Sequence, residues 1–391
     1  MRAGGVALKI QRRRYTRAAV FEVFIHIHIR ERTGANRDIV GLHEAFLDDG
    51  HICMAFERHG RSLAEVLDRG PLPPDRVVRV TRQLLGALDR MHRCGYAHTD
   101  VKPGNILYSP RTGEARLADL GCADNRFHQG SQPGTREYTA PELILGAPQG
   151  ASLDLWGLGC TVFEMLTGRL LFSPRKVAAK KYREFSHGAD AVEVPLAPSE
   201  RQDRLVERAE QFKRGDLIAG KYRLDRRLGS GRYATVWSAT RISDRKLDGS
   251  YDTLWGYAQR QSDGAATKTE RERLDREWRK AKGADDLLDL ALNYEHLLLI
   301  AAICGPFPPG VIDGARYRDS YFESAGGFRF EPKIGRDTLR ERLRRIGGLR
   351  GRSLDGATEF LRGLLQLDPA RRASAADSLK SPWLASTTPA L

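Results

Sequence analysis

The stretch His98-Thr-Asp-Val-Lys-Pro-Gly-Asn105 decides how this sequence is interpreted, together with Asp119-Leu-Gly121, which follows it closely. Transfer of a phosphoryl group needs few reactive groups but strict positioning of charge. A carboxylate must accept or orient a hydroxyl proton, and Asp100 is suited to that task. An amine must neutralise the moving phosphoryl group, and Lys102 stands two residues further on. The pattern therefore indicates phosphoryl-transfer chemistry.

Two further residues in the same pattern offer oxygen ligands of the kind that Mg²⁺ prefers, namely Asn105 and Asp119. A plain loop rich in caps and turns would also contain Asp, Lys, Pro, Gly and Asn. Such a loop does not predict four chemically matched residues at this spacing, with a second Asp-x-Gly turn after them. We therefore interpret Asn105 and Asp119 as metal ligands and Asp100 and Lys102 as catalytic residues.

Composition bounds the class of protein. The 391 residues carry 64 Lys and Arg against 50 Asp and Glu, a formal charge of +14, and 41% are hydrophobic. At about 150 residues per domain, this predicts two to three domains or one large two-lobed fold with a real core. No apolar run approaches the roughly 18 residues of a membrane-spanning helix. The opening MRAGGVALKIQRRR has no apolar stretch of a secretory signal.

Cysteine usage and charge distribution concern compartment and partners. The five cysteines are odd in number and share no metal-like spacing, which favours a reduced compartment, and we expect the cytoplasm and nucleus. Basic and acidic residues alternate closely, as over 268–280, which is more typical of a solvated helix face than of a phosphate-binding surface. We expect a monomer that contacts neither membrane nor nucleic acid directly. A basic RNA-binding protein is the alternative that charge alone supports.

Hydrophobic periodicity predicts the elements of the first 172 residues. Strands are expected at 6–10 and 51–57, the second preceded by the turn Asp48-Asp-Gly50. Residues 74–95 have helical spacing with a stop at Gly95, and 153–166 is so apolar that we expect a helix buried on every side.

The remainder of the chain changes character twice. Residues 173–284 read as a polar insert with one glycine-bearing apolar island at 216–240, and globular helices return from 285. A helix is expected at 356–367, and the last ordered segment closes at Trp383. There are no internal repeats.

Over residues 1–172 and 285–386 the sequence resembles the eukaryotic protein kinases. The resemblance implies an α+β, bilobal fold, with a small β-rich N-lobe at 1–59 and a larger helical C-lobe at 60–172 and 285–386. It implies ATP and Mg²⁺ as cofactors and a protein as substrate. In the family's order, Lys9 would grip the α- and β-phosphates, Glu22 would be its ion-pair partner, Phe56 the gatekeeper, and Glu57 to His59 the hinge that holds adenine.

The same resemblance covers the segment after the catalytic motif. Gly134-Thr-Arg-Glu-Tyr-Thr-Ala-Pro-Glu142 is similar to the end of an activation segment, Asp154 and Trp156 match the buried helix under the active site, and Arg372 would pair with Glu142. In the family, a lysine at the position of Lys102 and a threonine at that of Thr135 mark serine/threonine specificity.

A narrower resemblance is to the kinases of serine/arginine-rich splicing factors. It is carried by His98-Thr-Asp, Ala118-Asp-Leu-Gly121, Tyr15-Thr-Arg-Ala-Ala19 and the stretch from Tyr294 to Phe322. It implies Arg/Ser-rich substrates such as splicing factors. Because Thr99 replaces the family's arginine, no cation stands there to receive an activation-loop phosphate.

Departures from the family leave a second function open, a catalytically impaired pseudokinase that serves as a binding scaffold. Residues 20–29, which should form the helix carrying Glu22, are a β-branched alternating run that prefers strand. His26 and His28 in this run are expected to be exposed side chains and not metal ligands, because no third ligand is near. The family's Tyr-Arg-Ala-Pro-Glu arginine is Thr139, and its Lys-Pro-Glu-Asn glutamate is Gly104.

The glycine-rich loop that should precede the Val6–Ile10 strand appears instead at 221–237, inside the insert. Gly229, Gly231 and Val236 keep the loop's spacing and would cover the ATP phosphates, since glycine lets the backbone approach phosphate oxygens. Fold-back of the insert, a fusion remnant and a misordered gene model each explain the position. We predict that 221–237 forms an antiparallel hairpin that pairs with 6–10, because that strand would otherwise be an open sheet edge.

Arg-rich substrates need an acidic docking surface. Asp285, Asp286, Asp289 and Glu295 form an acidic cluster that would serve, and a solvated helix start explains the same residues equally well.

Overall fold

The computed structural model describes residues 5–34, 37–123, 135–147, 150–173, 212–231, 234–263, 292–329 and 338–385. The chain divides into two compact units, the first formed by residues 1–59 and 186–275 and the second by residues 60–185 and 276–391. The described part of the insert, 212–263, thus belongs with the first 59 residues of the chain.

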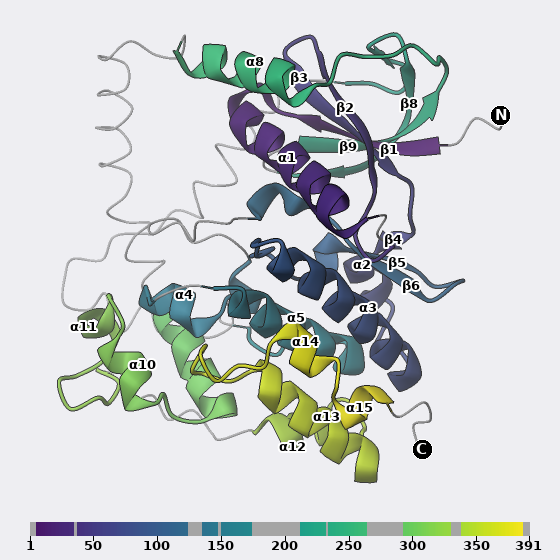
Figure 1. Ribbon diagram of the computed structural model, residues 1–391. Helices are drawn as coiled ribbons and strands as arrows, with labels where there is room; N and C mark the ends of the chain where they lie inside the picture. The colour runs from purple at the N-terminus through teal and green to yellow at the C-terminus, as the bar shows by residue number, and fades with distance from the viewer. Residues whose placement is uncertain are drawn as a thin grey trace, which may run out of the picture. The chain divides into compact units, whose positions relative to one another are not determined.

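The first unit is built on a six-stranded sheet in the order β2-β3-β1-β9-β8-β7 (Figure 1). Its bounds are β1 Gly5–Gln11, β2 Leu42–Asp48, β3 His51–Glu57, β7 Leu217–Ile218, β8 Tyr222–Ser230 and β9 Ala234–Arg241. The tight β2–β3 turn has positive φ at Asp49 (41°) and Gly50 (76°), as a two-residue hairpin loop of this hand requires. The strands predicted at 6–10 and 51–57 and the turn between β2 and β3 are confirmed.

The insert supplies three of these strands. β9 runs antiparallel to β1 with Gly5 opposite Thr240 and Gln11 opposite Ala234, and β8 pairs with β9. The predicted pairing of the 221–237 hairpin with the 6–10 strand is therefore confirmed. One apolar core joins the two parts, because Leu8, Ile10 and Phe46 are buried together with Tyr222, Leu224 and Trp237. The sheet would lack half of its strands and part of this core without the insert.

The sheet is curled so strongly that its edge strand β2 meets the start of β8, the strand next to the opposite edge. Lys221 Nζ, just before β8, lies 2.8 Å from Glu44 Oε1 on the edge strand β2, and the Tyr222 hydroxyl donates to the same carboxylate. The rings of Tyr222 and Phe46 stack at 5.8 Å between centroids. Strands β3, β1 and β9 lie between β2 and β8 in the order of the sheet, so these contacts close its curvature.

Two helices complete the first unit: α1 Thr16–Thr33 and α8 Tyr251–Asp263, which packs against α1. The strand preference of residues 20–29 is not realised, because the alternating run lies in the middle of α1, the helix that the family resemblance implied. Packing on both sides of the helix overrides the strand preference of its residues. His26 is buried beside Phe56, 5.3 Å between ring centroids, and the expectation that it is exposed is wrong.

The second unit is mainly helical, with a small sheet in the order β4-β5-β6. Its elements are β4 Arg61–Ser62, α2 Leu63–Leu67, α3 Pro74–Arg93, β5 Ile106–Ser109, β6 Glu114–Leu117, α4 Pro141–Leu145, α5 Ser152–Thr167, a helix over 292–304, α10 Pro309–Asp313, α11 Arg318–Tyr321, α12 Leu339–Arg345, α13 Gly351–Leu364, α14 Ala375–Ser378 and α15 Pro382–Ala385. The helices predicted at 74–95 and 153–166 are confirmed. The helix predicted at 356–367 starts five residues earlier, at Gly351.

Helix α5 lies directly beneath the loop that holds Asp100. A Cβ at Gly157 would meet the Val101 carbonyl oxygen at 2.7 Å, so only glycine allows this approach. The α5 helix is buried over almost its whole length, as its uniformly apolar sequence predicts. It is a rigid base for the residues above it.

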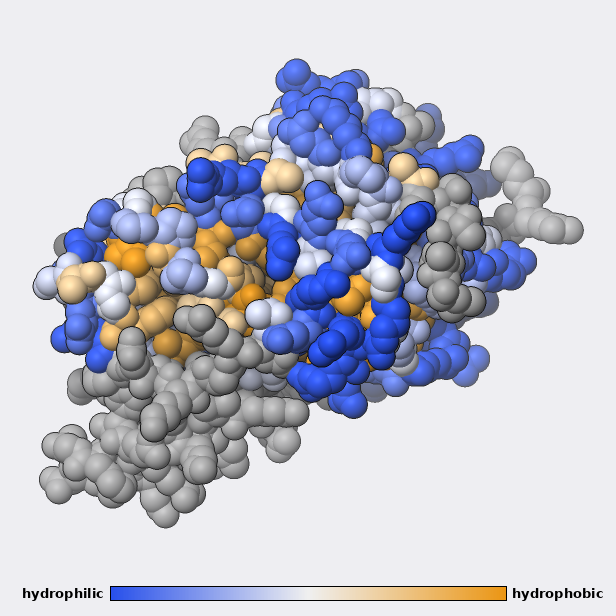
Figure 2. All heavy atoms as spheres, turned by 90° about the horizontal axis from the view of Figure 1, so that it is seen from below, coloured by the Kyte–Doolittle hydropathy of each residue, from blue (hydrophilic) through white to orange (hydrophobic). Residues whose placement is uncertain are grey.

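The exposed large apolar residues of the described part are Leu170, Leu217, Leu228, Ile242 and Tyr317. Figure 2 shows one face of the molecule, where apolar side chains (orange) form a patch bordered by hydrophilic ones (blue). Among the described residues, no helix combines the length and the apolar character needed to cross a membrane.

Candidate active site

In the second unit, the Asp100 carboxylate accepts hydrogen bonds from three side chains. Lys102 Nζ and Asn105 Nδ2 donate to Oδ2 at 2.7 and 2.9 Å, and Thr135 Oγ1 donates to Oδ1 at 3.2 Å. Lys102 Nζ also donates to Thr135 Oγ1 at 2.5 Å. The residues predicted from one short motif are thus joined with Thr135 in a single network, in which Lys102 offsets the charge of Asp100.

The backbone around Asp100 is fixed from below by Asp154 on α5. The amides of His98 and Thr99 donate to Asp154 Oδ2 and Oδ1 at 2.8 and 2.7 Å, and His92 Nε2 lies 2.7 Å from Oδ2. Thr99 has a φ of 66°, a left-handed conformation that a threonine adopts only when its surroundings impose it. The hydrogen bonds from the His98 and Thr99 amides to Asp154 impose this conformation, and they orient Asp100.

Burial opposes ionisation of Asp154, but the pKa of its carboxyl is lowered overall, because His92 donates a hydrogen bond and the charges of His92 and His98 favour the ionised form. Asp154 was identified from the sequence, whereas His92 was not. The signal that could have revealed His92 is its place in the last turn of the amphipathic helix α3.

Asn105 and Asp119 are held on neighbouring backbone segments. The Ala118 amide donates to the Asn105 carbonyl at 2.9 Å, and His98 Nε2 lies 3.0 Å from the Ala118 carbonyl. Asp119 follows directly, with a left-handed backbone of φ 62° and ψ 72°. Because Asn105 Nδ2 is directed to Asp100, its amide oxygen remains the atom suited to a metal, as does the carboxylate of Asp119.

These two oxygen donors fit Mg²⁺, which proteins usually bind through one or two side-chain oxygens together with substrate phosphates. Among the described residues, no group of three or more His, Cys, Asp and Glu side chains could hold a metal by itself.

A small pocket of about 10 Å³, the room of about one water molecule, lies beside Asp100, between the loop, Thr135 and α5. Tyr138 lines it and donates to Glu164 Oε2 at 2.5 Å. Burial, and secondarily the negative charges of Asp68 and Glu137, raise the pKa of Glu164, although the bond from Tyr138 lowers it. The Tyr138–Glu164 pair was missed, because the two residues lie 26 positions apart with no shared motif.

The segment that follows Thr135 is anchored by a fully buried ion pair. Arg372 Nη1 and Nη2 donate to Glu142 Oε1 and Oε2 at 2.5 and 2.9 Å, and the guanidinium lies 5.2 Å from the Trp156 ring centroid. This bidentate geometry is the strong form of an Arg–carboxylate contact. The predicted pairing of Arg372 with Glu142 is confirmed.

In the first unit, Lys9 and Glu22 form a closed ion pair. Lys9 Nζ donates to both Glu22 oxygens, at 2.8 and 2.7 Å, and the exposed fractions of the two side chains are 12% and 1%. Lys9 lies on β1 and Glu22 on α1, so the pair joins the sheet to the helix. The predicted pairing of Lys9 with Glu22 is confirmed, although the helix that carries Glu22 was not expected from its residues.

The glycine-bearing hairpin lies next to Lys9 in the same sheet. Val236 on β9 is opposite Lys9 on one side and Gly229 on the other, and the Gly231 amide donates to the Ala234 carbonyl at 2.9 Å. Among the described residues, a Cβ at Gly229 would meet no atom within 4 Å, and one at Gly231 a single atom, at 4.0 Å. The two glycines thus leave free space where a ligand could approach the backbone, which fits a phosphate loop.

The predicted hinge residues lie at the end of β3. The Glu57 side chain contacts the segment just before β2, where the Gly41 amide donates to Glu57 Oε1 at 2.9 Å. His59 is half-buried and is the last residue of the first of the two segments that form the first unit. A role in holding adenine through backbone groups stays a prediction for both residues.

Only one residue of the acidic cluster predicted at the start of the C-terminal region lies in the described part of the chain. Asp285, Asp286 and Asp289 lie outside the described residues, and Glu295 is only 6% exposed in the helix over 292–304. The structure therefore gives no support from Glu295 for a docking site there.

In a comparison with known protein families, the protein kinase domain matches residues 4–214, which are more than half of the chain. The chain belongs to the protein kinase domain family. The predicted α+β, bilobal protein-kinase-like fold is confirmed, with a β-rich first unit and a mainly helical second unit.

Several curated proteins are similar to parts of the chain. Serine/threonine-protein kinase prp4 of Schizosaccharomyces pombe is 32% identical over 143 residues, which are 35% of this chain and 30% of prp4. Serine/threonine-protein kinase PknL of Mycobacterium tuberculosis is 35% identical over 176 residues, 43% of this chain and 44% of PknL. Probable serine/threonine-protein kinase clkA of Dictyostelium discoideum is 30% identical over 213 residues, 44% of this chain and 23% of clkA. The chain matches less than half of the length of each.

Proposed function

We propose that the protein is a serine/threonine protein kinase that transfers the γ-phosphate of ATP to a protein hydroxyl with the help of Mg²⁺. The observation that carries the proposal is the hydrogen-bond network in which Lys102, Asn105 and Thr135 converge on Asp100. Asp100 would orient the substrate hydroxyl and accept its proton, and Lys102 would balance the charge on the transferred group. Asn105 and Asp119 would hold Mg²⁺, which polarises the phosphates when bound.

On the nucleotide side, Lys9 would hold the α- and β-phosphates, kept in place by Glu22. Gly229, Gly231 and Val236 would cover the phosphates with backbone donors, and Glu57 to His59 would hold adenine. The relatives named as serine/threonine-protein kinases support the choice of hydroxyl, as does the contact of Lys102 with Thr135.

The finer proposal is that the substrates are Arg/Ser-rich proteins such as splicing factors, met in the cytoplasm and nucleus by a monomeric enzyme. Its support is the resemblance carried by His98-Thr-Asp and Ala118-Asp-Leu-Gly121. With Thr99 in place of arginine, activity would not require an activation-loop phosphate. Thr99 Oγ1 instead donates to the Cys122 carbonyl at 2.7 Å and ties the segment after Asp119 to the loop directly.

The alternative is a pseudokinase scaffold. Two features favoured it, the displaced glycine loop and the unusual helix of Glu22. The loop occupies a place in the sheet beside β1, and Glu22 is paired with Lys9, so both features are compatible with an active enzyme.

The two functions are separated by one set of measurements on the full chain. A kinase gains thermal stability with Mg-ATP by mass action and transfers ³²P to an Arg/Ser peptide faster than to a peptide with Lys in place of Arg. Equal rates on both peptides would overturn the Arg/Ser proposal alone. Stabilisation by Mg-ATP without transfer to any Ser or Thr peptide would favour the scaffold.

A further inference from the structure

Helix α1 is made of residues that disfavour a helix. Its central run, residues 20–29, is Val-Phe-Glu-Val-Phe-Ile-His-Ile-His-Ile, and apart from Glu22 each residue is β-branched, aromatic or histidine. Such residues lose side-chain freedom against the preceding helical turn. The helix must therefore be held by contacts with its surroundings and not by its own propensity.

Those contacts come from two sides. No residue of α1 from Ala18 to Ile29 is exposed. Val20, Ile25 and Ile29 are at most 3% exposed, and α1 packs against β2 and β3 of the sheet. A helix that is apolar all round must be covered all round, and the second cover is α8.

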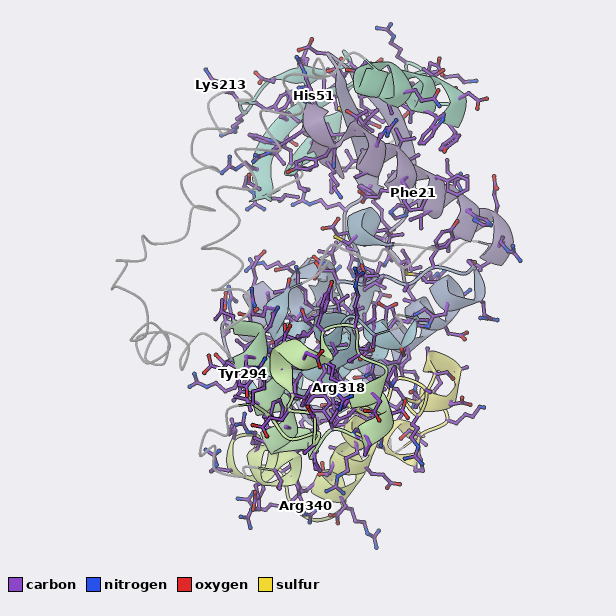
Figure 3. The ribbon with its side chains drawn as sticks, turned by 90° about the vertical axis from the view of Figure 1, so that its left-hand side faces the viewer. Phe21, His51, Lys213, Tyr294, Arg318 and Arg340 are labelled. Carbon is purple, nitrogen blue, oxygen red and sulfur yellow. The ribbon has the colours of Figure 1, made fainter. Side chains whose placement is uncertain are left out.

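The contacts between α8 and α1 involve aromatic side chains. The ring of Phe24 on α1 lies 5.4 Å from that of Tyr251 on α8, and Tyr251 stacks on Trp255 at 5.9 Å. Phe24 also contacts Phe21 and His28 along its own helix, at 6.3 and 5.6 Å. Figure 1 shows α8 beside α1, and Figure 3 shows Phe21 on α1. Leu254 and Ala258 of α8 are fully buried.

Helix α8 is itself fixed to the sheet. The Tyr257 hydroxyl donates to the Gly50 carbonyl in the β2–β3 turn at 3.1 Å. Just before α8, a Cβ at Gly249 would lie 1.7 Å from the Ala45 carbonyl oxygen, so the backbone there touches β2. The insert therefore brings α8 to α1 as a part of the folded unit.

We propose that α8 is a positioning helix that holds α1 so that Glu22 reaches Lys9, with Tyr251 and Trp255 as its positioning residues. This inference rests on the proposed kinase function. A change at Phe24 would affect Glu22 directly, because the two residues are two positions apart on α1. The Lys9–Glu22 hydrogen bonds of 2.7 and 2.8 Å allow little displacement of the helix. Loss of the aromatic contacts would let α1 shift or unwind and would break the ion pair.

The test uses the full chain with Tyr251→Ala and Trp255→Ala, singly and together, and Asp252→Ala as the matched control, since Asp252 is exposed on α8. The double variant is expected to lower kcat/KM for ATP at least tenfold, mainly through KM, and Tyr251→Phe with Trp255→Phe is expected to restore it. Asp252→Ala is expected to retain wild-type values. In a Glu22→Gln background, the double variant is expected to have little further effect.

Hydrogen exchange of residues 16–33 gives a readout independent of activity. The α1 amides are expected to exchange at least tenfold faster in the alanine variants, while those of β1 and β3 keep their protection. Unchanged α1 exchange, or an undiminished loss of kcat/KM in the Glu22→Gln background, would overturn the inference. If the double variant does not fold, the single variants and Phe24→Ala decide by the same criteria. An inactive wild type with the expected α1 exchange would contradict the kinase function and leave the positioning role standing.

Discussion

At the scale of single residues, Asp100 is the centre of the candidate site, and its neighbours specify what each substitution should do. Asp100→Asn keeps the shape of the side chain but cannot take up a proton. We expect the rate of phosphoryl transfer to fall by about 10²–10⁴-fold. The affinity for Mg-ATP should stay within about twofold, because the proposed nucleotide contacts are made by other residues. Single-turnover kinetics and a nucleotide titration measure the two effects; transfer at the wild-type rate would remove Asp100 from the mechanism.

Asp154 permits a test of the support beneath the loop. Three donors converge on its two oxygens, and Asn in its place offers only one acceptor atom. We expect Asp154→Asn to lower the free energy of unfolding by about 2–4 kcal/mol. The folded-state pKa of Asp154 is lowered, so its contribution is complete above the unfolded value near 3.8 and is lost as the pH falls below it. Denaturant unfolding at pH 7 and pH 3 should show the difference between wild type and variant narrowing in acid.

Most residues of the candidate site could be predicted because each carries its own chemistry within a short motif. Asp100, Lys102 and Asn105 lie within six consecutive positions, and the ion pairs of Lys9 and Arg372 follow from the family resemblance. His92 and the Tyr138–Glu164 pair could not be predicted, since their roles depend on which helices pack together.

At the scale of elements, the two residues of the ion pair that joins the start of β8 to β2 differ in how deeply they are buried. The side chain of Lys221 is 4% exposed, whereas that of Glu44 is 26% exposed. Glu44→Ala leaves a buried ammonium without its carboxylate, and we expect a loss of about 3 kcal/mol. Lys221→Met replaces the charge with an apolar chain of similar length and should cost about 1 kcal/mol or less. Calorimetric unfolding of both variants checks the order; equal losses would show that the burial of the Lys221 ammonium does not set the cost.

The elements also show where sequence reasoning failed. The residues of α1 favour a strand because propensity counts only local preference, whereas the sheet and α8 cover the helix from both sides. The hairpin at 221–237 was placed correctly because an unpaired β1 edge and an isolated hairpin are each unfavourable, and pairing resolves both.

At the scale of the whole molecule, one buried histidine should set part of the response to acid. Burial, opposed by the hydrogen bond to the Thr139 carbonyl, lowers the pKa of His296 from 6.5 to about 4. Between these values the unfolded chain binds more protons than the folded one, so stability falls as the pH drops from 6.5 to 4. We expect this loss to be about 3 kcal/mol.

His296→Gln keeps a donor for Thr139 but does not titrate in this range. The variant should therefore unfold with a flatter dependence on pH between 6.5 and 4, which urea titrations across this interval would measure. The same slope in both proteins would assign the acid response to other groups.

The pairing of β1 with β9 also has a consequence for how the protein is made. Gly5 and Thr240 lie opposite each other in the sheet but 235 positions apart in the sequence. At about 5–20 residues per second, a ribosome needs on the order of ten to fifty seconds to cover that distance. For much of this time β1, β2 and β3 have left the ribosome with one sheet edge unpaired, while helices of the second unit such as α3 and α5 follow them. The first unit can therefore complete its sheet only after β8 and β9 have been synthesised. We expect its folding to depend more on chaperones that shield strand edges than the folding of a kinase whose small lobe is contiguous in sequence.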